Sequence, residues 1–196
     1  MDQIGYPFGG LIDQKLWLIL IIQNKCHQIS AMANRIISIT PRRRAAIVFN
    51  GGLMFALGLV AGLLFTFALI GRVEAWPLLP ALDITIPGSV QAWRQSHIGI
   101  LFNAITLFAI AAVGKSILLT DRVQNLLVVC VLLTGWFNIA GFVTGTLFGA
   151  RGLAMGGDLA NSVTYIFFLV AVVTAIVQAT LIVVGAFRGM RTIGLG

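Results

Sequence analysis

His97 is the histidine of this chain that stands beside a membrane-length apolar segment, which begins at Ile98. A neutral imidazole there is suited to hold a metal, but a lone histidine at a helix entrance also serves as an interfacial hydrogen-bonding residue or a proton relay. Asn103 lies six residues further along, which in a helix is about 9 Å higher and roughly 120° around. The two side chains are therefore not stacked, although both can flank one cavity. A plain helix–helix contact explains Asn103 as well as a ligand contact does.

A second group of candidate side chains falls in a later apolar segment, over about residues 126–149. Thr134, Asn138 and Phe142 are spaced four residues apart, so they share one face of a helix, while Trp136 points elsewhere. Threonine and asparagine at this depth are compatible with a structural role as well as with a binding site. The shared face is therefore a candidate wall of a pocket.

The remaining reactive residue types exclude several classes of protein. No predicted span carries an acidic residue, because these four lie in predicted loops: Glu74, Asp83, Asp121 and Asp158. That argues against a proton pump or a cation-coupled transporter built on membrane carboxylates. No serine–histidine–acid set, Walker loop or dinucleotide fingerprint is present. The two cysteines, Cys26 and Cys130, form neither a disulfide framework nor a haem-attachment signal.

The histidine count also distinguishes between classes of haem protein. A bis-histidine electron-transfer cytochrome needs two histidines on facing spans, whereas this chain has His97 at a span and His27 in its N-terminal arm. A haem bound within one protomer would therefore have one protein ligand and an open site. That arrangement binds a substrate to iron rather than shuttling electrons.

The elements that must position these residues are membrane helices. Of 196 residues, 59% are hydrophobic and 10% are charged, and the mean hydropathy is +1.00, whereas soluble domains carry about 25% charged residues. The net charge of +7 does not indicate nucleic-acid binding, because most of it lies in short flanks, where lysine and arginine set membrane orientation. The cluster at residues 42–44 is interpreted in the same way, as an anchor at lipid headgroups.

Four apolar segments predict an all-α, four-helix transmembrane bundle over residues 44–191. We place the spans at about residues 45–71, 98–120, 126–149 and 163–187. Residues 1–43 are predicted to form an interfacial or poorly ordered arm, and Met32 is an alternative start. The short link at 121–125 makes the second and third spans antiparallel neighbours.

Two further features of the bundle follow from residue types. The loop over about residues 72–96 contains Trp76 and Trp93 and is too apolar for free coil, so we expect an interfacial lid with both tryptophans at headgroup level. Small residues four apart favour close helix packing. They are Gly58 and Gly62 in the first span, and Gly141, Gly145 and Gly149 in the third.

The distribution of lysine and arginine predicts the orientation. The N-terminal arm, the second connection and the C-terminal tail hold ten of them, whereas the other two loops hold Arg72, Arg94 and Arg151. Because cytoplasmic segments carry the excess, both termini are expected to be cytoplasmic. His97 then lies at the outer-leaflet end of the second span.

Several short segments resemble the styrene oxide isomerase family in their order and spacing. They are I-P-G-S at residues 86–89 with Trp93, His97-x-Gly99, Leu101-x-Asn103, Gly135-Trp136-x-Asn138 and Arg151-Gly152-Leu153. The resemblance covers about residues 44–188, on the same four-helix plan, and excludes the arm.

The resemblance implies a homotrimeric, multi-pass enzyme of the bacterial inner membrane that contains ferric haem b and takes a small apolar epoxide from styrene degradation. It implies that His97 is the metal ligand, that Trp136 and Asn138 belong to the cofactor site, and that Asn103, Thr134 and Phe142 lie at the substrate. Iron would act as a Lewis acid on the epoxide oxygen, the benzylic C–O bond would open, and hydride would migrate to give an aldehyde with no net redox change. A water-poor pocket would limit capture of the cation by water.

Two positions depart from the family's pattern. Thr134 stands where the family has an aspartate, and Phe142 where it has a tyrosine. A lost hydroxyl removes a hydrogen bond of about 1–3 kcal/mol, so these two changes bear on the identity of the substrate, while the haem ligand His97 is kept. Two other interpretations stay open: a haem-binding membrane protein without isomerase activity, such as a sensor or carrier, and a structural membrane subunit without a cofactor.

Overall fold

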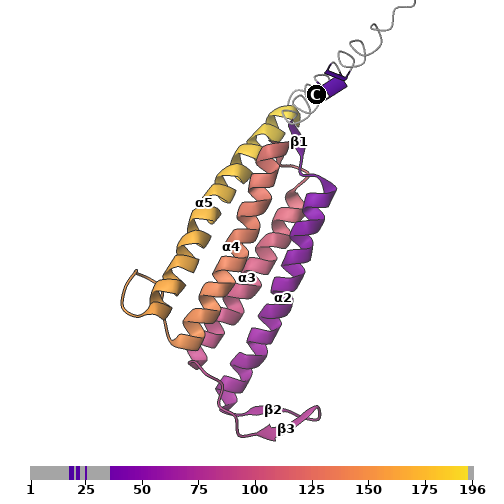
Figure 1. Cartoon of the computed structure of the whole chain (residues 1–196). Coiled ribbons are helices and arrows are strands. Elements are labelled where there is room, and N and C mark those ends of the chain that lie inside the picture. The colour runs from indigo at the N-terminus through magenta and orange to yellow at the C-terminus, as the bar shows by residue number, and fades with distance from the viewer. Residues whose placement is uncertain (1–17, 20, 23–24, 26–35, 194–196) are drawn as a thin grey trace, which may run out of the picture.

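The fold is a bundle of four long helices that run alternately up and down (Figure 1). The computed structural model describes residues 18–19, 21–22, 25 and 36–193. The helices are α2 (Pro41–Ile70), α3 (Val90–Val113), α4 (Asp121–Phe148) and α5 (Leu159–Ile193). All four are long and apolar enough to cross a membrane, which confirms the predicted multi-pass, four-helix organisation.

The helix ends differ from the predicted spans because hydropathy locates only the apolar part of a helix, whereas capping groups set its ends. The second span was predicted over residues 98–120, but α3 runs from Val90 to Val113, so Lys115 lies beyond it. Asp121 was predicted in a loop, but it is the first residue of α4, where a negative charge is favourable. The helix α2 begins at Pro41, because proline is well suited to the first turn.

The start of α3 is fixed by the segment that precedes it. The Ser89 side chain accepts a hydrogen bond from a backbone N–H of the first turn, as an N-cap does. Gly88 has a φ of +94°, and a Cβ there would lie 2.6 Å from the Thr146 carbonyl oxygen. Trp93 donates from Nε1 to the Pro87 carbonyl at 2.7 Å and is 4% exposed. The prediction that Trp93 lies in an interfacial loop was therefore wrong, because the helix begins before it and buries its ring.

The rest of that loop forms a hairpin below the bundle. Strands β2 (Val73–Ala75) and β3 (Leu79–Leu82) pair antiparallel, and Figure 1 shows them beyond the end of α2. Trp76 at the turn is 81% exposed and Leu78 is 86% exposed. Their placement at lipid headgroups stays a prediction.

At the opposite end of the bundle, a buried glutamine joins four elements. Strand β1 (Ile36–Ser38) pairs antiparallel with β4 (Leu118–Thr120). The Gln124 side chain, fully buried, accepts from the Thr40 N–H at 3.2 Å and from Arg43 Nη1 at 2.9 Å. Its amide nitrogen lies within 3.2 Å of three backbone carbonyl oxygens, those of Ile37, Ser38 and Leu119.

The predicted arm over residues 1–43 is therefore ordered in its last part, because Gln124 holds residues 37–40 against α4 and α2 begins at Pro41. Arg43 also pairs with Asp121 at 2.8 Å, which fastens the start of α2 to the start of α4. The predictions for Met32, Cys26 and most of the segment before residue 36 lie outside the described residues.

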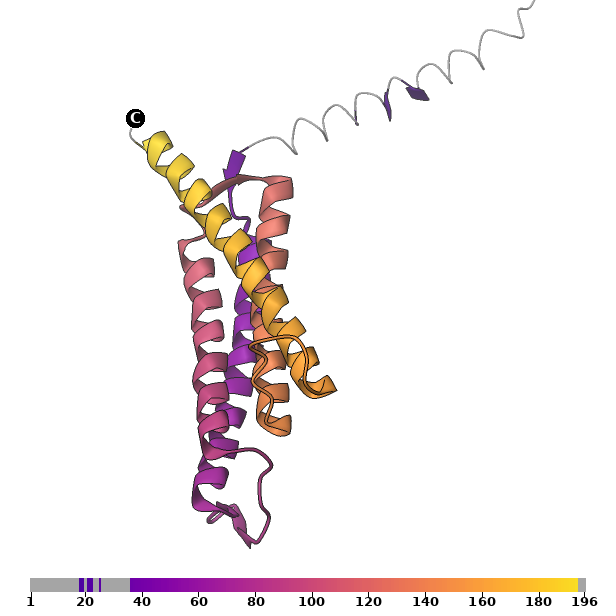
Figure 2. The ribbon, with the colours of Figure 1, turned by 90° about the vertical axis from the view of Figure 1, so that its left-hand side faces the viewer.

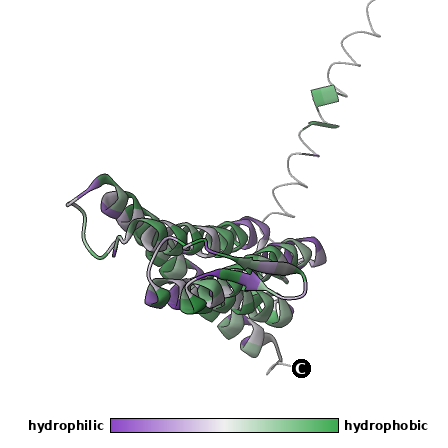
Figure 3. Cartoon of the chain, turned by 90° about the horizontal axis from the view of Figure 1, so that it is seen from below, coloured by the Kyte–Doolittle hydropathy of each residue, from purple (hydrophilic) through white to green (hydrophobic). Residues whose placement is uncertain are grey.

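The four helices are arranged with α2 against α3, and α4 between α3 and α5. Figure 2 shows α5 inclined across the other three helices. Gly141 allows close packing, since a Cβ there would lie 2.6 Å from the Phe168 ring of α5. Gly149 was expected in the same packing stripe, but it ends α4 with a φ of +67° and has open space at its Cβ position. Viewed along the bundle, all four ribbons are largely apolar (Figure 3).

Candidate functional site

His97 lies in the third turn of α3 and faces the glycine pair of α2. A Cβ at Gly62 would lie 2.6 Å from two atoms of the imidazole, Nδ1 and Cε1. A Cβ at Gly58 would lie 2.6 Å from the Leu101 side chain, one turn further along α3. The predicted close approach at the G-x-x-x-G pair is thus confirmed, and the group that occupies the space at Gly62 is the histidine ring.

The hydrogen bond of His97 fixes the tautomer of its neutral ring. Nδ1 lies 2.8 Å from the Gly58 carbonyl oxygen, which can only accept. Nδ1 therefore carries the proton, and Nε2 keeps its lone pair. No described residue bonds Nε2, and the side chain is half-buried. A histidine whose one ring nitrogen donates to a backbone carbonyl is oriented to bind a metal through the other.

Asn103 and Asn138 form a polar contact between α3 and α4. Asn138 Nδ2 donates to Asn103 Oδ1 at 3.2 Å, and Asn103 Nδ2 donates to the Gly99 carbonyl at 2.8 Å. Both side chains are half-buried. This contact agrees with the interpretation of Asn103 as a helix–helix contact. The second N–H proton of each amide has no acceptor among the described residues.

Thr134 and Trp136 of α4 are directed toward different helices. The Thr134 hydroxyl lies 2.8 Å from the Thr174 hydroxyl of α5, and Thr134 is buried. Trp136 Nε1 donates to Asn50 Oδ1 of α2 at 3.0 Å. Trp136 thus points away from the face of Thr134, Asn138 and Phe142, in agreement with the helical spacing.

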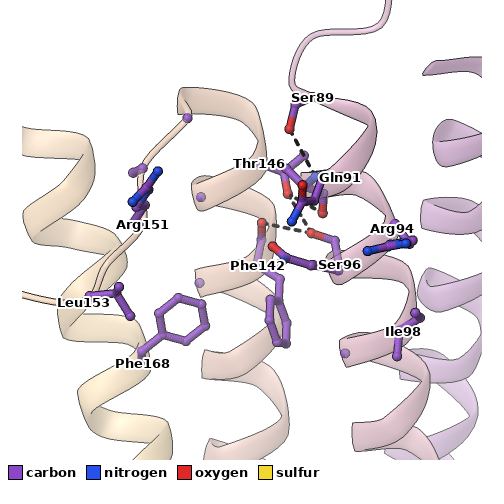
Figure 4. A pocket seen from close by; sticks show the side chains of 17 residues that line it. Ser89, Gln91, Arg94, Ser96, Ile98, Phe142, Thr146, Arg151, Leu153 and Phe168 are labelled. Carbon is purple, nitrogen blue, oxygen red and sulfur yellow. Dashed lines mark hydrogen bonds between the residues drawn. The ribbon is translucent and has the colours of Figure 1, made fainter. Parts of the chain in front are cut away.

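Phe142 lines a cavity of about 980 Å³ that opens beside α3, α4 and the start of α5 (Figure 4). Its ring packs against Gly99 and lies edge-on to Phe168, with the ring centroids 5.4 Å apart. Ser96 Oγ donates to the Phe142 carbonyl and lies 2.6 Å from Thr146 Oγ1. These contacts fix the α3–α4 wall. The remaining lining residues include two arginines, Arg94 of α3 and Arg151 of the α4–α5 loop.

The predicted site residues are therefore distributed over more than one surface of a single chain. Phe142 lines the cavity, but His97, Asn103, Thr134, Trp136 and Asn138 are not among its lining residues. His97 faces α2, whereas Gly99, which does line the cavity, lies about 200° further around α3. Sequence reasoning missed two parts of this geometry, the Gly58 carbonyl that accepts from His97 and the Ser96–Thr146 hydroxyl pair, because each joins two helices.

Four apolar helices with an oriented, half-buried imidazole at a helix–helix groove define a multi-pass membrane protein with a candidate metal-ligating histidine. The chain belongs to the styrene oxide isomerase family, whose sequence model matches residues 43–187. It is similar to the styrene-oxide isomerase of Pseudomonas fluorescens, with 28% identity over 155 residues, 74% of this chain and 87% of that protein. The matched region includes all of α3 and α4, α2 from residue 43 onward and α5 up to residue 187.

Proposed function

We propose that this membrane isomerase converts an epoxide, styrene oxide or a related aryl epoxide, to the corresponding aldehyde and that it does so with haem b. Membership of the styrene oxide isomerase family and the name of the Pseudomonas fluorescens relative support the reaction. The reaction is an isomerisation, so one C–O bond of the epoxide breaks, a hydride moves to the adjacent carbon, and a C=O bond forms without an external redox partner.

The observation that carries the haem proposal is the hydrogen bond between His97 Nδ1 and the Gly58 carbonyl at 2.8 Å. In the neutral ring this bond leaves a lone pair on Nε2, and Nε2 is the atom that would hold the haem iron. Gly62 provides the space in which the ring lies, since a Cβ there would displace it. These residues fit the group, and bound ferric haem would supply a Lewis acid for the epoxide oxygen.

The other predicted site residues differ in what they can do in this proposal. Asn103 is held by the Gly99 carbonyl and by Asn138, so its amide has a fixed orientation, and its second N–H proton would donate to a polar substrate atom. Within one chain, Phe142 and Phe168 have no task beside a group held at His97, because their aromatic wall lines the cavity at Gly99, about 200° around α3 from that histidine. Thr134 has no such task, because its hydroxyl is bonded to Thr174.

The proposal also includes a homotrimer in the bacterial inner membrane. His97 is only half-buried in one chain, and apolar side chains beside it are exposed, among them Ile98 at 55% and Phe102 at 69%. A second copy or lipid would cover this surface. The excess of lysine and arginine near both termini supports cytoplasmic ends.

The test is turnover by detergent-purified protein, with absorbance measured on the same sample. We expect a Soret band and formation of phenylacetaldehyde from styrene oxide. His97→Ala should lose both signals, while His27→Ala, which removes the other histidine of the chain, should keep both. A Soret band without aldehyde formation from any aryl epoxide would favour a haem-binding protein without isomerase activity. Full turnover by protein without haem would overturn the proposal that haem is the cofactor.

A further inference from the structure

We propose that Arg94 binds a propionate carboxylate of the haem whose iron His97 ligates. This inference rests on the proposed function, and it adds a cofactor-binding residue that recognises the anionic edge of the porphyrin. The argument depends on the position of Arg94 on α3, on its lack of an ion-pair partner, and on the apolar surface that continues beyond His97.

Arg94 and His97 lie on adjacent parts of the same helix surface. They are three residues apart on α3, so Arg94 is about 4.5 Å nearer the helix start and roughly 60° around from His97. Residues with this spacing are neighbours on a helix. Arg94 is exposed, and its long side chain can extend over the neighbouring surface. A group held at Nε2 of His97 is therefore within the reach of its guanidinium.

Arg94 forms no ion pair with any of the described residues. The ion pairs within that part of the chain are Arg43 with Asp121 and Arg72 with Glu74. No acidic residue lines the cavity to which Arg94 also contributes. Figure 4 shows its guanidinium beside α3, apart from Arg151 on the α4–α5 loop. A guanidinium without an acidic partner is suited to bidentate recognition of a carboxylate.

The α3 surface beyond His97 is apolar, as is the edge of haem b opposite its carboxylates. Ile98, Phe102 and Ile105 of α3 are 55%, 69% and 54% exposed, and all lie further from the helix start than Arg94. The order along the helix is thus a cation, an imidazole donor and then an apolar strip. Haem b has the same order of chemistry, with two carboxylates on one edge, iron at the centre and an apolar opposite edge. The order of residue types along α3 therefore assigns the carboxylate edge of the haem to the Arg94 end of this surface.

The experiment compares two porphyrins on two arginine variants. Haem-free protein is titrated with haem b and with its dimethyl ester, which lacks the carboxylate charges, and the Soret band reports both affinity and histidine ligation. Wild-type protein should bind haem b more tightly than the ester, by on the order of ten- to a hundredfold, as expected for a charge-assisted contact. In Arg94→Gln, affinity for haem b should fall to that of the ester, while affinity for the ester should not change.

Arg151→Gln is the matched control, because Arg151 is also exposed, lacks an ion-pair partner among the described residues and lines the other side of the cavity. It should keep the preference for haem b, and Arg94→Lys should keep part of it. Gel filtration and circular dichroism of each variant confirm folding.

The outcomes separate this inference from the proposed function. Failure of wild-type protein to bind either porphyrin would overturn the proposed haem function. Tight histidine-ligated binding with an equal preference for haem b in wild type and Arg94→Gln would leave that function standing and overturn the role of Arg94. An equal loss in Arg94→Gln and Arg151→Gln would show a general effect of surface charge and would also overturn it.

Discussion

At the scale of single residues, the position of the His97 ring depends on the absence of a side chain on α2. A Cβ at Gly62 would lie 2.6 Å from Nδ1 and Cε1, a distance that real contacts do not show. The ring would have to move away from the Gly58 carbonyl, and its Nδ1–H would lose its acceptor. The glycine therefore contributes to the site through the histidine rather than through any contact of its own with a ligand.

Gly62→Ala should consequently lower haem retention several-fold, measured as Soret absorbance per unit of protein after purification. Gly52→Ala is the control on the same helix, because a Cβ there meets no atom within 4 Å. It should retain haem as wild type does, with at most a small gain in helix stability. Equal haem content in the two variants would show that the ring does not need the Gly58 contact to bind iron.

The family resemblance predicted Thr134 at the substrate, but the contacts of its side chain are with α5. Its hydroxyl bonds Thr174, which also bonds the Val170 and Ala171 carbonyls of its own helix. We expect Thr134→Val to lower the free energy of unfolding by about 0.5–1.5 kcal/mol, seen as a lower melting temperature in detergent, and to leave turnover unchanged. Combined with Thr174→Val, it should lose little more, because both changes remove the same contact. A large fall in kcat at unchanged stability would instead place Thr134 at the substrate.

Residue types and spacing predicted part of this arrangement. The four-residue spacing predicted that Trp136 diverges from Thr134 and Asn138, and the two glycines of α2 predicted a close helix contact. The partners were not predictable, because they are brought together by packing between helices. Nothing local indicates that the Gly62 space receives His97, or that Thr134 meets a hydroxyl forty residues away.

At the scale of elements, the start of α3 is held by contacts with the end of α4. Gly88 combines a positive φ of +94° with a position in which a Cβ would lie 2.6 Å from the Thr146 carbonyl oxygen. Thr146 also bonds Ser96 and the Ala92 carbonyl of α3. The segment before α3 therefore sets the register between α3 and α4, and with it the relative positions of Asn103 and Asn138.

Gly88→Ala tests this directly. Left-handed backbone costs a residue with a Cβ about 1–2 kcal/mol, and the clash with Thr146 adds to it. Gly156→Ala is the control, because Gly156 has a φ of +115° but open space at its Cβ position. We expect the melting temperature to fall further in Gly88→Ala than in Gly156→Ala. Equal losses would mean that only backbone strain matters and that the contact with α4 contributes nothing.

Gln124 has the corresponding role at the other end of the bundle. It satisfies backbone groups of residues 37–40 and of β4 from a fully buried position. Gln124→Met keeps the side-chain length but leaves these backbone groups without partners, which should lower the free energy of unfolding by about 1–3 kcal/mol. Thermal unfolding should show the loss, and trypsin should cut faster after Arg42. Gln91→Met, at an exposed position whose side chain has no hydrogen-bond partner among the described residues, should change neither. A similar loss there would contradict the role of Gln124.

The ends of the elements were the part of the fold least accessible from the sequence. Apolar length predicted the four helices, because burying each backbone in lipid requires internal hydrogen bonds. The cap at Ser89 and the burial of Trp93 depend on Pro87 and Thr146, so α3 was predicted to begin too late. Likewise, residues 37–40 are too few to be predicted as a span, and the groups that hold them, β4 and Gln124, are about 80 residues further along the chain.

At the scale of the whole molecule, the two ends of the bundle differ in charge. Among the residues from 36 onward, the end with β1 and β4 holds Arg42, Arg43, Arg44, Lys115, Arg122, Arg188 and Arg191, whereas the hairpin end holds Arg72, Arg94 and Arg151. Four helices that alternate in direction place residue 41 and residue 193 at the same end (Figure 1). The charge asymmetry therefore predicts one orientation for all four helices, with the entrance of α3, which holds Arg94 and His97, on the side away from the cytoplasm.

Labelling of single cysteines in intact cells tests this orientation. In a chain without Cys26 and Cys130, Leu78→Cys at the 86%-exposed hairpin turn should react with a membrane-impermeant maleimide added outside a Gram-negative host with a permeabilised outer membrane. Arg122→Cys, at the end with β1 and β4, should react only after the inner membrane is opened. Because the helices alternate, the two positions must lie on opposite sides. Reaction of Arg122→Cys and protection of Leu78→Cys in unopened cells would invert the orientation and place the His97 end at the cytoplasmic surface.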